Sequence, residues 1–191
     1  EKKRDAYPLL EAAIKELENV PQYQKKQEEY KLTYGKIISN MGSYYYQRKE
    51  YEEALKWHKK ALEFRKISLP DRVMDSYRTI MSDYFCMKQY EKGYETYREA
   101  VKKTQPDALF LVRAIGCELC LLKEKKEENL EKQILEELPV QIERVVELAV
   151  SNRRMNVGVL KDLQKKLEEL EAWTELQELV KEYRTKIEEY L

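Results

Sequence analysis

The segment YYQRKEYEEALKWHKKA, Tyr45–Ala61, has the same residue pattern as YFCMKQYEKGYETYREA, Tyr84–Ala100. Tyrosines match at the start of both copies, small residues match further along, and a histidine in one copy stands where the other has a tyrosine. Bulky residues fill the space between neighbouring helical hairpins, and small residues let two helices approach closely, so the pattern predicts repeated helix pairs. The matched pairs, each 39 residues apart, are Tyr45/Tyr84, Tyr51/Tyr90, Ala54/Gly93, His58/Tyr97 and Ala61/Ala100.

This pattern is similar to the tetratricopeptide repeat (TPR), whose motif has small and aromatic residues at fixed positions of a helical hairpin. Gly42, Tyr45, Tyr51, Ala54 and Ala61 fit that motif in the first copy. The second copy departs from it, because a methionine, residue 81, replaces the first small residue, and the spacing exceeds the usual length of about 34 residues. The resemblance implies a right-handed array of antiparallel hairpins, with the best-defined repeats at about 35–68 and 74–103 and degenerate hairpins after 106.

The composition and the positions of the prolines favour an all-α chain of about nine helices, forming a single TPR-like domain over residues 1–191. The chain has only five Gly and five Pro and is 38% charged, with many strong helix formers. Pro21, Pro70 and Pro106 mark helix boundaries, whereas Pro139 is expected to kink or split a helix over 129–150. A helix is expected from Gln22 to Arg48, a connector at SNRRMN (151–156), and a final helix pair over 159–191. Whether residues 129–191 are true repeats or a cap is left open.

Charge and hydropathy exclude broad classes of function. Thirty-six basic residues balance thirty-six acidic ones, so no net field favours nucleic acid or a membrane surface. No apolar run approaches the roughly 18 residues of a transmembrane helix, and no signal-peptide pattern is present, so a cytoplasmic location is expected. The first residue is Glu, so we expect the chain to be a fragment of a longer one; whether a DNA-binding domain precedes it is left open.

Candidate catalytic and metal-binding residues have simpler structural interpretations. Cys117 and Cys120 form a CELC motif in the middle of a predicted helix. A zinc site would need two more ligands, and a redox-active thiol would need to lie at the start of a helix. His58 lies on a helix-packing face, where its ring nitrogen is expected to find a local partner. Carboxylates recur in mixed Lys/Glu faces, and no glycine-rich phosphate loop is present. We therefore predict no enzyme activity, no cofactor and no metal site.

Side chains suited to binding lie on the first helix of each predicted hairpin, which lines the concave surface of such arrays. The helix that contains Gly42 has a mostly uncharged stripe, and the equivalent stripe one repeat later includes Asp75, Thr79 and Cys86. Asn and Ser side chains can hydrogen-bond a peptide backbone, and Arg side chains can bind a carboxylate. Cys117, in the next predicted unit, is expected on the same surface. A hydrated surface or a contact with the last helices is the alternative. The candidate peptide-binding residues are Lys36, Asn40, Ser43, Tyr46, Gln47, Arg78, Ser82, Phe85 and Arg113.

The long, tyrosine-rich repeat also resembles the repeat domains of bacterial peptide-pheromone receptors of the Rap, Rgg, NprR, PlcR and PrgX type. That resemblance implies quorum sensing and transcription regulation, with a short signalling peptide in the concave groove and an effect on dimerisation. One alternative is a structural adaptor or assembly scaffold that forms a homodimer through the final hairpin around Trp173, Leu176 and Val180. A weaker alternative is a Rap-like regulator of a response regulator. In every case the predicted partner is a short peptide or a protein.

Overall fold

The computed structural model describes residues 6–125, 127–151 and 156–191, and every regular element in these ranges is a helix. The all-α prediction is therefore confirmed. The first elements are α1 (Tyr7–Glu18), α2 (Gln22–Lys25), α3 (Glu28–Gln47), α4 (Tyr51–Ser68), a 3-10 turn η1 (Pro70–Arg72) and α5 (Val73–Cys86). The remaining elements are α6 (Tyr90–Val101), α7 (Ala108–Glu124), α8 (Glu128–Ser151), α9 (Asn156–Leu170), a 3-10 turn η2 (Thr174–Leu176) and α10 (Gln177–Glu188).

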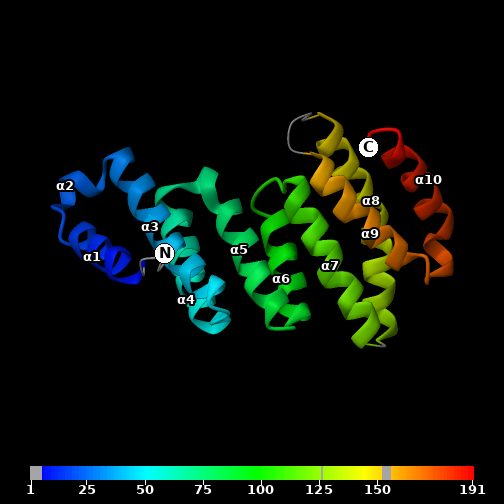
Figure 1. Ribbon diagram of the computed structural model, residues 1–191, viewed down its shortest axis with the longest axis horizontal. Coiled ribbons are helices and arrows are strands. Elements are labelled where there is room, and N and C mark those ends of the chain that lie inside the picture. Colours follow the sequence, from blue (N-terminus) through cyan, green and yellow to red (C-terminus); the bar gives the residue numbers. More distant parts are fainter. Residues whose placement is uncertain (1–5, 126, 152–155) are drawn as a thin grey trace, which may run out of the picture. The chain divides into compact units, whose positions relative to one another are not determined.

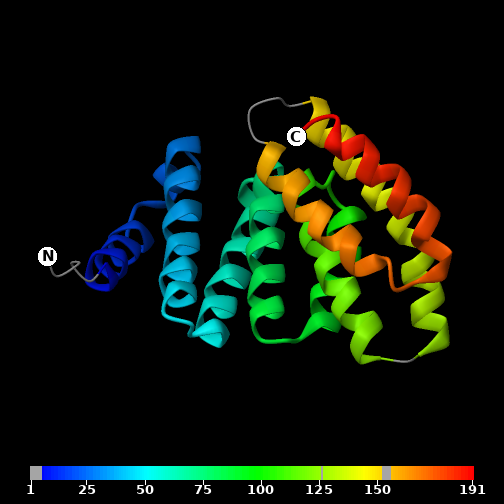
Figure 2. The same ribbon diagram turned by 45° about the vertical axis from the view of Figure 1, so that its right-hand side comes forward.

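The chain divides into two compact units, residues 1–89 and 90–191. In the first unit, α1 packs on α3, α3 on α4, and α4 on α5, so neighbours in sequence are neighbours in space (Figure 1). In the second unit, α6 packs on α7, α7 packs on α8 and α9, and α10 packs on both α8 and α9 (Figure 2). This consecutive packing is the predicted TPR-like helical-repeat arrangement, while the single domain over 1–191 stays a prediction.

The first unit has a core built between α1, α3 and α4. Ile38 and Met41 of α3 are buried there with Ile14 of α1 and Ala61 of α4. Tyr45 packs against this core and meets the ring of Tyr7 edge to face, with centroids 6.2 Å apart. Tyr45 is therefore a core residue of the repeat, as its match to Tyr84 indicates.

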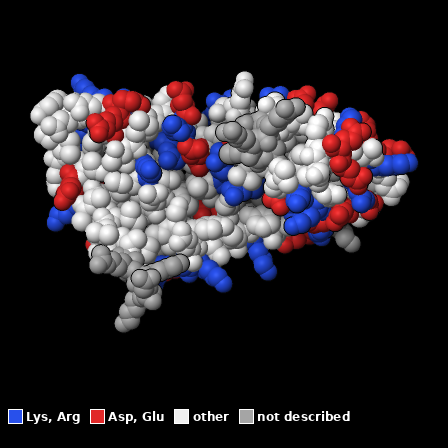
Figure 3. All heavy atoms as spheres, turned by 45° about the horizontal axis from the view of Figure 1, so that its top comes forward, with Lys and Arg blue, Asp and Glu red and all other residues white. Residues whose placement is uncertain are grey.

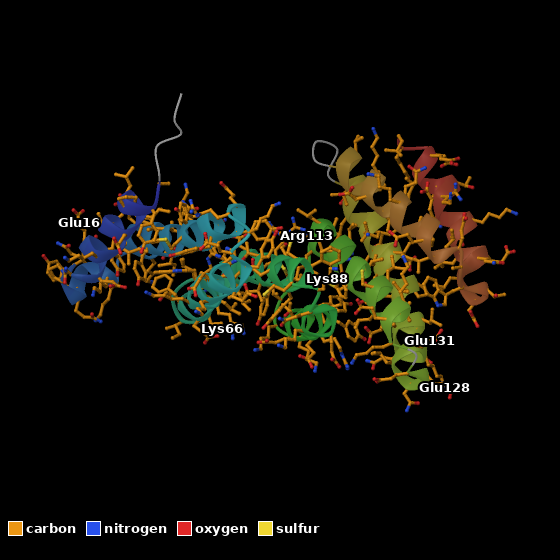
Figure 4. The ribbon with its side chains drawn as sticks, turned by 60° about the horizontal axis from the view of Figure 1, so that its bottom comes forward. Glu16, Lys66, Lys88, Arg113, Glu128 and Glu131 are labelled. Carbon is orange, nitrogen blue, oxygen red and sulfur yellow. The ribbon has the colours of Figure 1, made fainter. Side chains whose placement is uncertain are left out.

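The two repeats share a turn geometry as well as a sequence pattern. Lys49 and Lys88, which are equivalent in the repeats, have the only positive φ values among the described non-glycine residues, 65° and 58°. In each turn this residue's N–H bonds the carbonyl three positions back, and the next N–H bonds the carbonyl five positions back. These are the two hydrogen bonds of a Schellman motif, and they end α3 and α5 in the same way. Figure 4 labels Lys88 at the end of α5.

Two predicted helices have different boundaries in the structure. The helix expected over Gln22–Arg48 is divided into α2 and α3, because Gln27 between them has an extended backbone. The split considered at Pro139 does not occur, since α8 continues from Glu128 to Ser151. Ile134, Leu138 and Ile142 are completely buried on both sides of the proline, so packing on α7 and α9 offsets the lost backbone bond. Most of the expected connector at 151–156 lies outside the described residues.

Membrane insertion was not expected from the sequence. Within the described ranges, every helix is too short or too polar to cross a bilayer.

Replacing Lys49 or Lys88 by glycine should stabilise the protein. A residue with a Cβ pays an energy penalty at positive φ that glycine does not, so each variant should gain about 0.5–1 kcal/mol in the free energy of unfolding. Urea denaturation measures this change. Lys56→Gly, inside α4, is the control and should instead lose about 1 kcal/mol. Destabilisation by K49G and K88G alike would contradict the assigned turn geometry.

Candidate functional site

The predicted stripe on α3 lies largely at the surface. Lys36, Asn40 and Gln47 are exposed, and the amides of Asn40 and Gln47 bond no other described residue. Ser43 is half-buried and donates its hydroxyl hydrogen to the carbonyl of Ser39 at 3.2 Å, which leaves its oxygen able to accept. Three of the predicted α3 residues can therefore offer uncharged hydrogen-bonding groups to a ligand.

The side chains of the equivalent stripe on α5 make more contacts within the protein than those of the α3 stripe do. Ser82 donates to the carbonyl of Arg78 at 2.9 Å, and Arg78 itself lies 3.7 Å from the carboxylate of Asp75. A ligand carboxylate at Arg78 would therefore compete with Asp75. Phe85 is 39% exposed and supplies a large apolar surface at the end of the stripe. Figure 3 shows a broad area without charged side chains over the first unit.

Hydrogen bonds connect α3 and α5 at both ends of these stripes, directly at one end and through α4 at the other. At one end, the Tyr46 hydroxyl and the Cys86 sulfur are hydrogen-bonded at 3.2 Å. At the other, Arg65 of α4 donates to the Ser76 hydroxyl at 2.7 Å and to the Gly35 carbonyl at 3.4 Å. The two stripes therefore lie beside each other and form one candidate surface, which we call the α3–α5 face.

The third predicted position is not part of the α3–α5 face. Arg113 is exposed on α7, in the second unit, so its role beside the first-unit residues stays a prediction (Figure 4). Cys117, expected on the same surface, is completely buried. This expectation is wrong, because Cys117 faces the interior of the second unit.

A cavity of about 340 Å³ opens at the end of the α3–α5 face where α3 and α5 begin. Lys36 and Asp75, the first residues of the two stripes, line it together with Arg65 and Arg72. The sequence interpretation missed Arg65, although its position on the apolar stripe of α4, three residues after Leu62, was a usable signal. Leu32, Gly35 and Leu69 complete the lining.

His58 is a buried packing residue with an acidic partner. Its Nδ1 lies 2.6 Å from a carboxylate oxygen of Asp83, and neither side chain is more than 2% exposed. Burial raises the pKa of Asp83, and the hydrogen bond from His58 opposes that rise. Gly42 makes room for the imidazole, since a Cβ there would lie 2.3 Å from a ring carbon. The predicted local partner of the ring is therefore Asp83, across the α4–α5 contact.

The second unit buries a carboxyl group that the sequence did not single out. Gln141 of α8 donates to Glu118 of α7 at 2.7 Å, and Glu118 is completely buried. Burial raises the pKa of Glu118 to about 8. The neighbouring thiols are also held neutral, because burial raises the pKa of Cys117 to about 12 and that of Cys120 above its ordinary value. No cluster of three potential metal ligands occurs in the described part of the chain.

The final hairpin uses its apolar residues internally. Leu176 and Val180 are at most 3% exposed, and Leu163, Leu167 and Leu170 of α9 are completely buried. Trp173 is half-buried. Leu176 and Val180 therefore pack inside the second unit, and a homodimer through the final hairpin around Trp173 stays a prediction.

Comparison with protein families supports the repeat assignment. Residues 36–72 match the family described as "Tetratricopeptide repeat". This range covers most of α3, α4 and η1, including the stripe residues of α3 and most of the cavity lining. No curated protein matches the chain. The match supports a protein-binding repeat module, since TPR repeats are typically non-catalytic modules that bind partner proteins or peptides.

Replacing Gly42 by alanine should destabilise the protein by about 2 kcal/mol or more. The new methyl group would overlap the His58 ring, which Asp83 and the surrounding core hold in place. Gly158→Ala is the matched control, because no atom of the described residues lies within 4 Å of its added Cβ and alanine favours the helix by up to about 1 kcal/mol. Chemical denaturation should give opposite signs for the two variants. Equal stability of G42A and the wild type would contradict the close approach.

Replacing Glu118 by glutamine should flatten the pH dependence of stability. Between the ordinary pKa of 4.5 and the folded value of about 8, the folded protein binds one proton more than the unfolded chain. The free energy of unfolding therefore falls as pH rises through this window, and E118Q should be more stable than the wild type by on the order of 1–3 kcal/mol at pH 8.5. Gln141 offers an acceptor for the new amide, since its buried oxygen has no other partner.

Urea denaturation at pH 5 and pH 8.5 measures this difference. Glu136→Gln, at an exposed position of the same unit, is the control and should follow the wild type at both pH values. A stability difference between E118Q and the wild type that is the same at both pH values would show that burial does not hold Glu118 protonated.

Proposed function

We propose that the chain is a binding module that holds a short peptide along the α3–α5 face. The observation that carries this proposal is that Asn40 and Gln47, on a TPR-matched helix, expose amides that bond no other residue in the described part of the chain. A carboxamide offers donors and an acceptor, as a peptide backbone requires, and the two residues lie two helical turns apart on one face. An extended peptide can therefore bond both along the helix.

Apolar surface where α3 and α5 end should add to the free energy of peptide binding. Phe85 exposes 39% of its surface, and Tyr46 beside Cys86 is half-buried. Burying an exposed aromatic ring under a ligand side chain is a common source of affinity. The α3–α5 face thus combines hydrogen-bonding groups with an apolar contact, a combination that suits a short peptide with at least one hydrophobic residue.

The biological role that fits such a surface is ligand sensing in a bacterial regulator. In this role a short signalling peptide binds the α3–α5 face and favours one arrangement of the helices, and this preference changes the activity of the regulator. The role requires recognition only, and no catalytic step, cofactor, membrane contact or nucleic-acid contact from this segment. The resemblance to peptide-pheromone receptors motivates the proposal of peptide sensing, and the TPR match supports the more general proposal of a protein-binding module.

The test uses peptides selected from a random library on the intact chain, with affinities measured by calorimetry. Asn40→Ala should weaken binding about threefold to tenfold, because it removes neutral hydrogen bonds to the peptide. Arg78→Ala should also weaken binding, since Arg78 lies in the middle of the α5 stripe. Asn129→Ala, an exposed asparagine of the second unit, is the control and should bind like the wild type. Unchanged affinity in both first-unit variants would refute the α3–α5 face as the binding surface.

A further inference from the structure

Arg65 is a buried cation that makes no ion pair within the described ranges. Its side chain lies on the apolar face of α4, and the residue is 7% exposed. It donates to Ser76 and to the Gly35 carbonyl, its Nε is buried without a partner, and it forms no ion pair with a described carboxylate. Burial lowers the pKa of Arg65, with the nearby Asp75 opposing and Arg72 adding to this effect. An uncompensated buried charge is costly, so its place beside a cavity needs an explanation.

Two further cations line the same cavity without ion pairs. Lys36 and Arg72 are exposed, and neither contacts a carboxylate among the described residues. Several other cations of the first unit do form ion pairs, because Lys31, Lys56 and Lys60 each pair with a glutamate. Figure 3 turns this end of the first-unit helices forward and shows basic side chains gathered there beside a few acidic ones.

The one acidic residue of the cavity lining can offset only one of these charges. Asp75 lies 3.7 Å from Arg78, which is outside the lining, and forms no ion pair with Arg65, Lys36 or Arg72. Three lining cations against one carboxylate leave two positive charges. The cavity volume of about 340 Å³ exceeds the volume of a water molecule, about 30 Å³, roughly tenfold. A small tetrahedral anion with part of its substituent can therefore enter.

We infer that this cavity is a binding site for a phosphate group in its dianionic form, held by Arg65, Lys36 and Arg72. The guanidinium groups supply donors in the planar arrangement that phosphate oxygens accept, and Lys36 adds a point charge at the rim. Leu32 and Leu69 form apolar walls that limit water and so strengthen the charge interactions. The site goes beyond the proposed function, because it requires no peptide and includes Arg65 and Arg72, which lie outside the α3–α5 stripes.

The test measures inorganic phosphate binding to the full chain at constant ionic strength, by calorimetry and by the shift of the unfolding midpoint. Phosphate should bind saturably and raise the midpoint, with chloride as the reference salt. Lys36→Gln and Arg72→Gln should each weaken phosphate binding about tenfold, because each removes one charge-assisted hydrogen bond. Both residues are exposed, so the variants should fold. Lys56→Gln, an exposed α4 cation away from the cavity, should bind phosphate like the wild type.

Each outcome decides for or against the site. Sulfate should bind like phosphate and acetate more weakly; equal binding of acetate would overturn the dianion assignment, and equal phosphate affinity in K36Q, R72Q and the wild type would overturn the site. O-phosphoserine distinguishes the source, since tighter binding than phosphate indicates a phosphorylated residue and equal binding indicates a free anion. Phosphate binding without any peptide binding would support this site while refuting the proposed function, so the two failures are distinguishable.

Discussion

The first unit depends on one side chain, His58, which reaches two other helices from α4. Its ring occupies the space that Gly42 leaves open on α3, and its Nδ1 bonds the buried carboxylate of Asp83 on α5. A larger residue at 42 would remove the space, and a residue at 83 without a carboxylate would remove the partner of the ring. Because one side chain contacts both helices, α3 and α5 are held against the same helix.

The packing of α3 and α5 on α4 determines the geometry of the α3–α5 face. With α3 and α5 fixed on α4, their equivalent stripes lie beside each other, closed at one end by Tyr46 and Cys86 and bridged at the other by Arg65. The cavity with its unpaired cations lies at the Arg65 end. The α3–α5 face therefore joins uncharged hydrogen-bonding groups and an apolar ring to a basic cavity, all on elements whose packing is fixed by buried residues. Rigid placement of this kind lowers the entropy cost of binding a flexible ligand.

The repeat pattern predicted the helices and the packing role of Tyr45 and His58, because small and bulky residues at helical spacing directly reflect burial. It did not predict the partner of His58, since Asp83 has no equivalent in the first copy, where Tyr44 occupies that position. Arg65 was missed for a related reason: its charge suggests a surface position, although it lies on the apolar stripe of α4 and is buried beside Ser76. Pro139 shows the opposite case: a proline predicts a break in the helix, but packing on both sides keeps α8 continuous through it.

The central claim is that the α3–α5 face of a TPR-like repeat binds a peptide. The most direct measurement is amide chemical-shift mapping of the chain during titration with a peptide selected from a random library. If the peptide binds the α3–α5 face, the largest shift changes should occur at exposed positions of α3 and α5, around Asn40 and Ser82, and continue toward the cavity at Lys36. Shift changes confined to α8, α9 and α10, with α3 and α5 unaffected at saturation, would contradict it.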